Sequence, residues 1–349
     1  MKSAKVYILI LNWNGWRDTI ECLESVFKSN YDSFQVIVCD NNSGDNSIQY
    51  IKQWAEDSLK LDIPEESRLK QILLPPLKKP VTYTIYEELE VTGIENLKNQ
   101  DAQMIIIKNR GNYGFAGGNN IGLRYVLARN DYDYIWILNN DTVVEKESLR
   151  NMVESMKQDP KIGAIGSKVL YYNEPDIIQT KAGGEFIEYL GYVKQIDWGK
   201  KDCGHEERKY RVDYITGAST LVSRKVLQTV GLINEDYFMY AEDIDWCIRI
   251  RQNGFKLGYC PNSLIWHKEG STAGYRSPLA EYYSTRNILI VIQRFYKKSI
   301  VSAFLVSLMV KVLNRLLRGQ AKNLVYILRA HWDFLCGKSG MLKEKSNLV

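Results

Sequence analysis

The sequence predicts an α/β fold, in which a mixed but mainly parallel sheet is flanked by helices and followed by a C-terminal helical extension. In the first half, short and almost continuously apolar segments alternate with segments of helical periodicity, which is typical of a parallel sheet covered on both faces. After residue 162, closely spaced strand-like segments predict that the same sheet is extended. The 349 residues are 45% hydrophobic and 25% charged, which excludes disorder, collagen or coiled coil for the chain as a whole.

The first half contains four predicted strands, each followed by a predicted helix. Each strand ends where its apolar run meets a polar residue, and ligands of such sheets bind at the carboxyl ends of the strands. We therefore expect a site built around these polar ends. The strands are 6–12, 36–40, 104–109 and 134–139, with ends at Asn12, Asp40, Asn109 and Asn139; the helices are 18–29 with Asp18 as its cap, a second ending near 55, 119–129 and 146–158.

The segment 56–101 interrupts this alternation. It contains four of the eight prolines and lacks a strong period, which predicts a surface insertion with a short hairpin around 81–86. Later strands are predicted at 162–172, 186–198, 212–216 and 256–260, with one clear helix at 242–252. These strands should form the wall that faces the strand ends of the first half. We expect a main domain at 1–277 and a helical region at 278–349.

A turn rich in glycine and asparagine follows the third strand and opens a helix, and its sequence is Asn109-Arg-Gly-Asn-Tyr-Gly-Phe-Ala-Gly-Gly-Asn-Asn120. Glycines let a backbone approach a ligand, and a helix N-terminus offers unpaired N–H groups to an anion. The spacing fits neither a dinucleotide-binding nor a Walker loop. A tight strand–helix turn is the alternative, although four glycines and four asparagines exceed what such a turn requires.

Two further segments contain candidate catalytic carboxylates. In Leu138-Asn-Asn-Asp-Thr142, Asp141 follows a strand directly and is placed to hold a divalent cation on a diphosphate, with Asx-turn chemistry as the alternative. His267 follows another apolar run and offers a nitrogen ligand.

The second segment is the start of the helix near 242, where Glu242 and Asp243 adjoin Tyr240 and Trp246. Two neighbouring carboxylates among aromatic residues suit a general base, although acids at a helix start also serve the helix dipole. We expect the i,i+4 pair of Asp245 and Arg249 to be structural.

The charge is unevenly distributed. The chain carries +5, of which +9 lies from Arg294 onward and −4 in the preceding 293 residues, and this argues against nucleic-acid binding. Helices are predicted at 280–295 and 300–317, the second with one polar stripe. This pattern indicates a helix lying on a membrane surface; packing on the catalytic domain or a dimer contact is the alternative. The polar stripe consists of Ser307, Lys311, Arg315, Arg318 and Lys322.

Targeting signals are weak. The apolar run at 6–11 is too short for a signal peptide, and the longest apolar run, 300–310, ends at Lys311, short of the roughly 20 residues of a membrane span. Six cysteines without paired spacing do not indicate a disulfide framework. We expect a cytoplasmic protein without a transmembrane helix, held at the inner face of the membrane.

Taken together, the motifs resemble the inverting family 2 glycosyltransferases of the GT-A fold, in particular the rhamnosyltransferase-like bacterial enzymes of surface-polysaccharide synthesis. The likeness covers roughly 6–287 without the insertion. The segments that carry it are Ile10-Leu-Asn-Trp-Asn14, Val38-Cys-Asp-Asn-Asn-Ser43, Asn112-Tyr-Gly-Phe-Ala-Gly-Gly-Asn-Asn120, Leu138-Asn-Asn-Asp-Thr142, Thr216-Gly-Ala218, 238–249 and Trp266-His267.

This resemblance implies a role for each matched residue. Asp40 would read the nucleotide base beside Asn12, and Asn119 would contact the donor. Asn139, Asn140 and Asp141 match the D-x-D metal motif, in which Asn139 replaces the first acid, and His267 completes the metal site. Asp243 matches the catalytic base. Glu242 would either orient this base or bind the acceptor.

The implied reaction transfers a sugar, rhamnose from dTDP-rhamnose, from a nucleotide diphosphate to a glycan or lipid-linked acceptor. Mg²⁺ or Mn²⁺ on Asp141 and His267 would neutralise the diphosphate, and oligomers through the C-terminal helices are possible. The alternatives are a sugar nucleotidyltransferase and a non-catalytic nucleotide-sugar-binding subunit. The first would need a basic Gly-rich loop after strand one, which 12–16 does not provide, and the intact Asp40, Asp141, Asp243 and His267 argue against the second.

Overall fold

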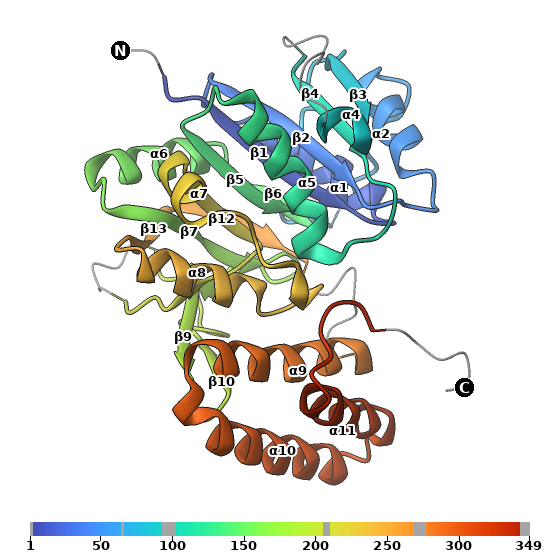
Figure 1. Cartoon of the computed structure of the whole chain (residues 1–349). Coiled ribbons are helices and arrows are strands. Elements are labelled where there is room, and N and C mark those ends of the chain that lie inside the picture. Colours follow the sequence, from blue (N-terminus) through green and yellow to red (C-terminus); the bar gives the residue numbers. More distant parts are fainter. Residues whose placement is uncertain (1–2, 64–65, 93–101, 205–209, 269–276, 343–349) are drawn as a thin grey trace.

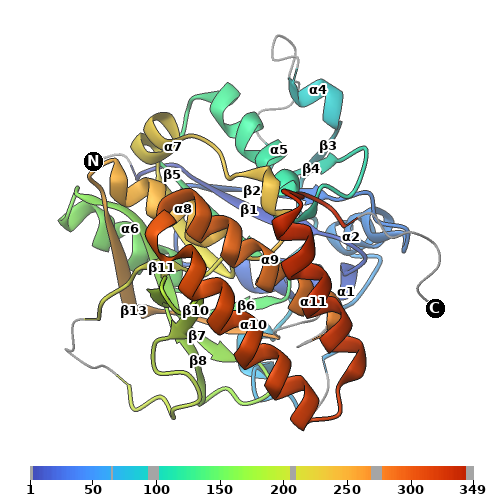
Figure 2. The ribbon, with the colours of Figure 1, turned by 60° about the horizontal axis from the view of Figure 1, so that its bottom comes forward.

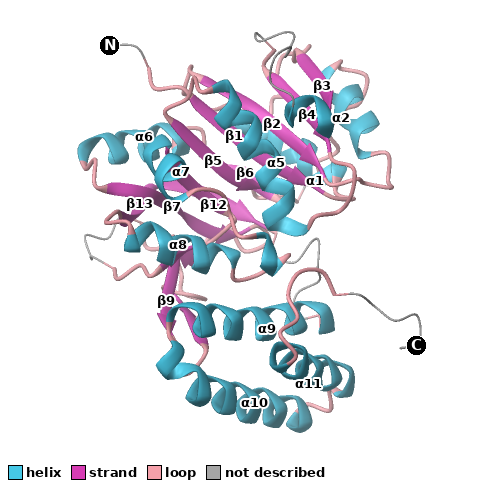
Figure 3. Ribbon diagram, in the orientation of Figure 1, coloured by secondary structure: helices cyan, strands magenta, loops and turns pink. Residues whose placement is uncertain are grey.

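The computed structural model describes residues 3–63, 66–92, 102–204, 210–268 and 277–342, and a ten-stranded sheet forms its centre (Figures 1 and 3). The strand order is β3-β4-β2-β1-β5-β12-β7-β13-β6, with β8 paired to β7. The first five of these strands are mutually parallel, whereas β12 runs antiparallel to both β5 and β7. The predicted mixed, mainly parallel sheet is confirmed. The strands are β1 (Val6–Asn12), β2 (Phe34–Asp40), β3 (Tyr83–Glu87), β4 (Met104–Lys108), β5 (Tyr134–Asn139), β6 (Thr142–Val144), β7 (Ile162–Tyr171), β8 (Ile178–Lys181), β12 (Ser219–Ser223) and β13 (Lys256–His267).

Helices cover both faces of this sheet, as the sequence predicts. Along β1, Val6, Ile8 and Ile10 pack into one apolar cluster, whereas Tyr7 and Leu9 pack into the other. A strand between two helical layers is apolar on both sides, and this explains its unbroken hydrophobic run. One layer contains α1 (Trp16–Val26), α2 (Ser47–Ala55) and α6 (Ser148–Gln158); the other contains α5 (Gly114–Arg129), α7 (Arg224–Val230) and α8 (Glu242–Gln252).

The insertion adds an edge to the sheet. The expected hairpin around 81–86 is wrong, because β3 pairs in parallel with the next strand, β4, whereas the two strands of a hairpin are antiparallel. Two short helices flank this edge strand, α3 (Lys70–Leu73) and α4 (Glu88–Thr92).

Other boundaries also differ from the prediction. The expected strand 186–198 is two strands, β9 (Gly183–Ile187) and β10 (Tyr192–Gln195), because the chain reverses at Gly191, whose φ is +60°. With β11 (Tyr214–Ile215) they form a separate small sheet. Helix α1 is preceded by Gly15, so Asp18 lies within the first turn and is not the cap.

Three C-terminal helices form a layer beyond the sheet (Figures 1 and 2): α9 (Pro278–Phe295), α10 (Ile300–Leu317) and α11 (Ala321–Leu335). The first two match the prediction closely, and α11 is additional. By length and composition alone, Lys297–Leu317 is sufficient to cross a membrane, and only 11% of its most apolar window is buried. The expectation that no segment is long enough is therefore wrong.

The three residues of the polar stripe that lie in α10, Ser307, Lys311 and Arg315, face the protein, whereas Arg318 and Lys322 lie beyond the helix end and are exposed. Ser307 is buried, the Lys311 Nζ donates to the Thr285 Oγ1 over 2.7 Å, and Arg315 forms an ion pair with Glu281 of α9. The apolar side of α10 consequently faces outward. The alternative of packing on the protein therefore holds for the part of the stripe within α10, whereas among the described residues nothing covers the apolar face of this helix.

Candidate active site

The ends of β1 and β2 are joined by a buried polar network. The Asn12 Nδ2 donates to the Asp40 Oδ1 over 2.6 Å, and the Ser43 hydroxyl and backbone N–H donate to the two Asp40 oxygens. Thr19 of α1 donates to the Asn12 Oδ1. Asn12 is fully buried and Asp40 is 2% exposed, so the chain itself fixes the orientation of both side chains at the strand ends.

The turn rich in glycine and asparagine is hydrogen-bonded to Asn41, the residue that follows β2. Asn41 accepts from the Asn109 Nδ2 and donates to the Gly114 carbonyl, which ties the turn to the end of the strand. A Cβ on Gly118 would lie 2.5 Å from the Leu11 Cδ1, so this glycine allows α5 to approach β1 closely. At Gly118 packing therefore explains the glycine without a ligand. The helix also begins at Gly114, five residues before the predicted start.

Asn119 lies within α5 and is 1% exposed. Its Nδ2 donates to the Phe115 carbonyl, whereas its Oδ1 is buried without a hydrogen-bond partner among the described residues. An unpaired buried oxygen of this kind is costly, so it marks a position where a donor group from a ligand would be favourable.

Asp141 and His267 are brought together, although 126 positions separate them in the chain. Strand β6 pairs with β13, and the His267 Nε2 lies 3.1 Å from the Asp141 Oδ1. The Asn139 Nδ2 lies 3.3 Å from the same ring nitrogen. Asn140 does not join them, because its Nδ2 donates to the Thr19 hydroxyl at α1.

This pair fits a divalent cation that is shared with a substrate. Two ligand atoms on adjacent octahedral positions, each about 2.1 Å from the metal, are about 3 Å apart, which matches the observed 3.1 Å. Within the described part of the chain no group of three or more His, Cys, Asp or Glu residues is able to hold a metal. A cation here would take its remaining ligands from diphosphate and water, as Mg²⁺ usually does.

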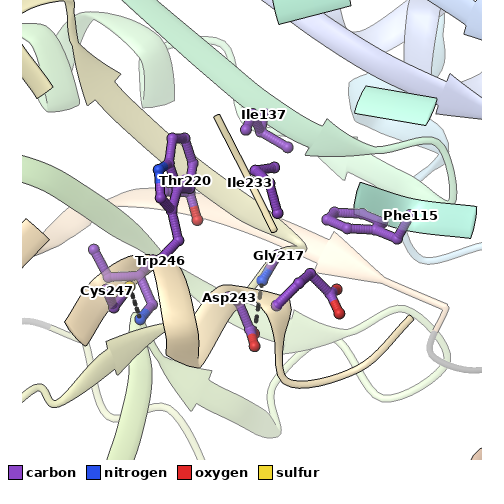
Figure 4. Close-up of a pocket in the computed structure, with 10 residues that line it drawn as sticks. Phe115, Ile137, Gly217, Thr220, Ile233, Asp243, Trp246 and Cys247 are labelled. Atoms are coloured by element: carbon purple, nitrogen blue, oxygen red, sulfur yellow. Dashed lines mark hydrogen bonds between the residues drawn. The ribbon is translucent and has the colours of Figure 1, made fainter. Parts of the chain in front are cut away.

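The acid pair at the start of α8 lies against an apolar pocket (Figure 4). Burial raises the pKa of Glu242, and the neighbouring Asp243 charge raises it further; its Oε2 has no partner among the described residues. Burial also raises the pKa of Asp243, whose Oδ2 accepts weakly from the Gly217 N–H over 3.4 Å. Glu242 is 6% exposed, whereas Asp243 is partly exposed and therefore accessible to a substrate hydroxyl.

Several predicted motifs meet at this carboxylate. The segment 216–218 links both halves of the site, because Gly217 donates to Asp243 while the Ala218 carbonyl accepts from the Asn139 N–H. The Phe115 N–H at the start of α5 donates to the Phe238 carbonyl. Asp245 is structural, as expected: it is fully buried and bonded to Arg249 and Tyr237.

The turn before Asp243 is strained and is held from α9. Phe238, Tyr240 and Ala241 have φ values of +63°, +65° and +72°, in a region that residues other than glycine rarely adopt. The fully buried Asn287 of α9 donates its Nδ2 to the carbonyls of Tyr237, Met239 and Tyr240 at 2.7–2.9 Å. The sequence reasoning missed the role of Asn287, because a single asparagine within a helix carries no motif.

Gln179 is the second residue that the sequence reasoning missed. It lies on β8, is 5% exposed, and its Oε1 lies 2.9 Å from the His267 Nδ1. Nothing in the local pattern of 178–181 distinguishes it from any other polar residue on a strand.

Family descriptions match most of the chain. "Glycosyltransferase like family 2" matches residues 94–286, and "Glycosyl transferase family 2" matches residues 7–69. The first match alone covers more than half of the chain, and the chain therefore belongs to glycosyltransferase family 2.

Curated relatives agree with this assignment. The chain is 26% identical over 196 residues, 56% of its length and 62% of the other protein, to the low-salt glycan biosynthesis hexosyltransferase Agl10 of Haloferax volcanii. It is 24% identical over 196 residues to the poly-β-1,6-N-acetyl-D-glucosamine synthase of Staphylococcus aureus, covering 54% of this chain and 45% of that one. The chain spans less than two thirds of the length of these relatives.

Solved structures share the fold. The mannosyltransferase PcManGT of Pyrobaculum calidifontis, in complex with GDP-Man and Mn²⁺, aligns over 97% of this chain and 89% of its own, with a TM-score of 0.56 and 13% identity. GalNAc-T7 with UDP, GalNAc and Mn²⁺ aligns over 89% of this chain and 51% of its own, with a TM-score of 0.58 and 14% identity. The predicted GT-A fold is thereby confirmed.

Proposed function

We propose that the chain transfers a sugar from a nucleotide diphosphate donor to a hydroxyl of a glycan or lipid-linked acceptor in surface-polysaccharide synthesis. The observation that carries this proposal is the Asp243 carboxylate, partly exposed and with a raised pKa, linked through 216–218 to the strand end that bears Asp141. The names of the relatives, a glycan hexosyltransferase and a polysaccharide synthase, support the same class of product.

In this reaction Asp243 accepts the proton of the acceptor hydroxyl as that oxygen attacks the anomeric carbon. The attack breaks the bond to the diphosphate in one displacement, so the anomeric configuration inverts. A raised pKa makes Asp243 a stronger base than an ordinary carboxylate. Glu242 is the more buried of the two acids and its pKa is raised, and in the protonated state it adds no second negative charge beside the base.

The donor is proposed to bind along the strand ends, with Asp40 and Asn12 at the base, Asn119 at the sugar–diphosphate and Asn139 beside the metal, while Asn140 supports this strand end through its bond to Thr19. Asp141 and His267 would hold Mg²⁺ or Mn²⁺, which neutralises charge on the leaving diphosphate. The Mn²⁺ complexes of two structural neighbours support this choice of metal. Rhamnose from dTDP-rhamnose is proposed from the sequence resemblance alone.

The test is a panel of nucleotide sugars with Mn²⁺ or Mg²⁺, scored by thermal shift and then by transfer to acceptor glycans. A donor at 100 times its Kd stabilises the protein by about 2.7 kcal/mol. Asp243→Asn should abolish transfer and leave donor binding within about threefold, because the change removes a base that the donor does not need. Asp236→Asn, which changes an exposed acid of the same loop, is the matched control. Substantial turnover by Asp243→Asn would refute the assignment of the base.

We also propose that α10 and α11 rest on the anionic inner face of a bilayer. Their outward sides carry large apolar residues beside the exposed Lys297, Lys298, Arg318 and Lys322, a combination that suits an anionic lipid surface. The apolar residues are Val301, Leu305, Met309, Val310, Leu313, Leu316, Leu317, Val325, Leu328, Trp332 and Leu335.

Vesicle sedimentation tests this surface. Met309→Gln with Leu316→Gln should reduce binding to vesicles that contain phosphatidylglycerol, while Leu89→Gln, an exposed apolar residue of α4, should not. Unchanged sedimentation of the double variant, or a dimer of the parent chain that the double variant dissociates, would contradict the membrane assignment.

A further inference from the structure

Arg286 precedes Asn287 on α9 and places its guanidinium in the interior. Only 1% of the residue is exposed. Among the described residues its acceptors are neutral oxygen atoms: the Asn287 Oδ1 at 3.0 Å, the Tyr282 hydroxyl at 3.2 Å and the Gly340 carbonyl at 2.8 Å. Burying a charge is costly, so an arginine that bonds neutral acceptors in three directions indicates a need for its fixed geometry.

The bond from Arg286 determines which way the Asn287 amide points. The Arg286 Nε is able only to donate, so the atom that faces it over 3.0 Å must be the amide oxygen. The carbonyls of the turn at 237–240 are able only to accept, so the atom that faces them must be the amide nitrogen. The contacts on both sides of the amide therefore require the same orientation, and Arg286 opposes a flip that would turn the N–H groups away from the turn.

The C-terminal segment, residues 336–342, holds Arg286 and the turn together. After α11 the chain turns back toward α9 (Figure 1). The Gly340 carbonyl accepts from the Arg286 Nη2, and the Gly340 N–H donates to the Asp236 carbonyl at the start of the turn. Leu342 is buried in an apolar cluster with aromatic residues of the turn and of α9. The segment thus contacts the arginine and the turn at once.

We propose that Arg286 is a positioning residue for the catalytic base. Held by the C-terminal segment, it fixes the Asn287 amide, which in turn holds the strained residues that lead into Asp243. The inference rests on the proposed function, in which Asp243 accepts the proton of the acceptor, and it identifies what keeps that carboxylate in place. Arg286 does not touch the reacting atoms, so its loss should change kcat and leave the binding of the donor intact.

Steady-state kinetics of Arg286→Met test this split. The kcat should fall by about 10- to 100-fold as the base loses its position, while the donor Kd from thermal shift should stay within about threefold. Arg315→Met is the matched control, because Arg315 is another largely buried arginine that bonds to α9, at Glu281, and its kcat should stay within about twofold. An unchanged kcat in Arg286→Met, or equal losses in both variants, would overturn the proposal.

A double-mutant cycle with Asn287→Ala tests whether Arg286 acts through the asparagine. If both residues act on the same turn, the double variant should have a kcat within about threefold of that of Asn287→Ala alone. A purely structural arginine would instead add its own loss to that of Asn287→Ala. Losses that multiply in the double variant would therefore refute the positioning role.

Gly340→Pro tests the hold of the C-terminal segment and does not depend on the folding of an Arg286 variant. Proline lacks the N–H that donates to the Asp236 carbonyl and is unable to adopt the φ of +68° at this position. The segment should detach, and kcat should fall by about tenfold or more with the donor Kd retained. An unchanged kcat would show that the segment does not hold the turn, which contradicts the proposal.

The kinetics of Asp243→Asn separate this proposal from the proposed function. If Asp243→Asn retains turnover, the assignment of the base fails, and the positioning of that base fails with it. If Asp243→Asn loses turnover while Arg286→Met keeps its kcat, the base stands and only the role of Arg286 is refuted.

Discussion

Replacing Asn287 by alanine should separate catalysis from donor binding. Its two N–H groups serve three carbonyls of 237–240, and the residue is fully buried, so the substitution leaves these acceptors without their partner. At about 1 kcal/mol for each of two or three lost hydrogen bonds, and more where a carbonyl stays dry, unfolding should become easier by about 2–4 kcal/mol.

The same substitution should affect the base through the strained turn. Residues with φ above zero cost about 1–3 kcal/mol each, so a turn that contains Phe238, Tyr240 and Ala241 relaxes once its clamp is lost. Asp243 follows directly, and a displacement of about 1 Å at a reacting group costs on the order of 100-fold in rate. The donor-binding strand ends do not contact Asn287, so the KM for the donor should change less than about threefold.

Urea denaturation and steady-state kinetics measure both effects. Asn253→Ala is the matched control, since Asn253 donates to one carbonyl at the exposed far end of α8 and its loss should cost less than about 1 kcal/mol with kcat unchanged. If Asn287→Ala loses the expected stability but keeps kcat within about twofold, the turn does not depend on its clamp. An equal rise in donor KM would instead mean a general loss of structure.

Three further predictions follow from burial and charge. Burial raises the pKa of Glu242 in the folded protein above its unfolded value, so the free energy of unfolding falls as pH rises and the buried acid ionises. Glu242→Gln should therefore melt at the same temperature as the parent at pH 4, where the acid is neutral in both states, and at a higher temperature at pH 9. The transfer rate should rise with pH through the raised pKa of Asp243, so an acid limb at the ordinary aspartate value near 3.9 would contradict its burial. Gly118→Ala should cost about 1–3 kcal/mol in urea denaturation by forcing Leu11 aside, whereas Gly44→Ala, with open space around its Cβ, should cost far less.

The sequence predicted the strand ends well because the signal there is local. An apolar run that stops at Asn12, Asp40 or Asn139 marks both the strand and its end, and the structure keeps all three at one edge of the sheet. The pairing of Asp141 with His267 came from the family resemblance, since nothing local connects β6 to β13. The contacts of Gln179 and Asn287 were beyond prediction, because both depend on segments that are distant in the sequence. Gln179 lies in a bulge of β8 that forms where β8 pairs with β7. Asn287 bonds to the turn before α8, which lies close to it only in the folded chain.

The C-terminal helices mark the limit of hydrophobic patterning. The pattern predicted 300–317 without error, yet it assigned the polar stripe no partner, because periodicity defines a face and not what covers it. The partners of the stripe lie on α9. Arg315 pairs with Glu281 and Lys311 bonds to Thr285. Each pair of residues is four positions apart on its own helix, and the two helices run antiparallel. Because Lys311 and Arg315 bond to α9, the apolar side of α10 faces outward. Asn287, also on α9, clamps the turn before Asp243, so one helix contacts both the proposed membrane layer and the catalytic turn.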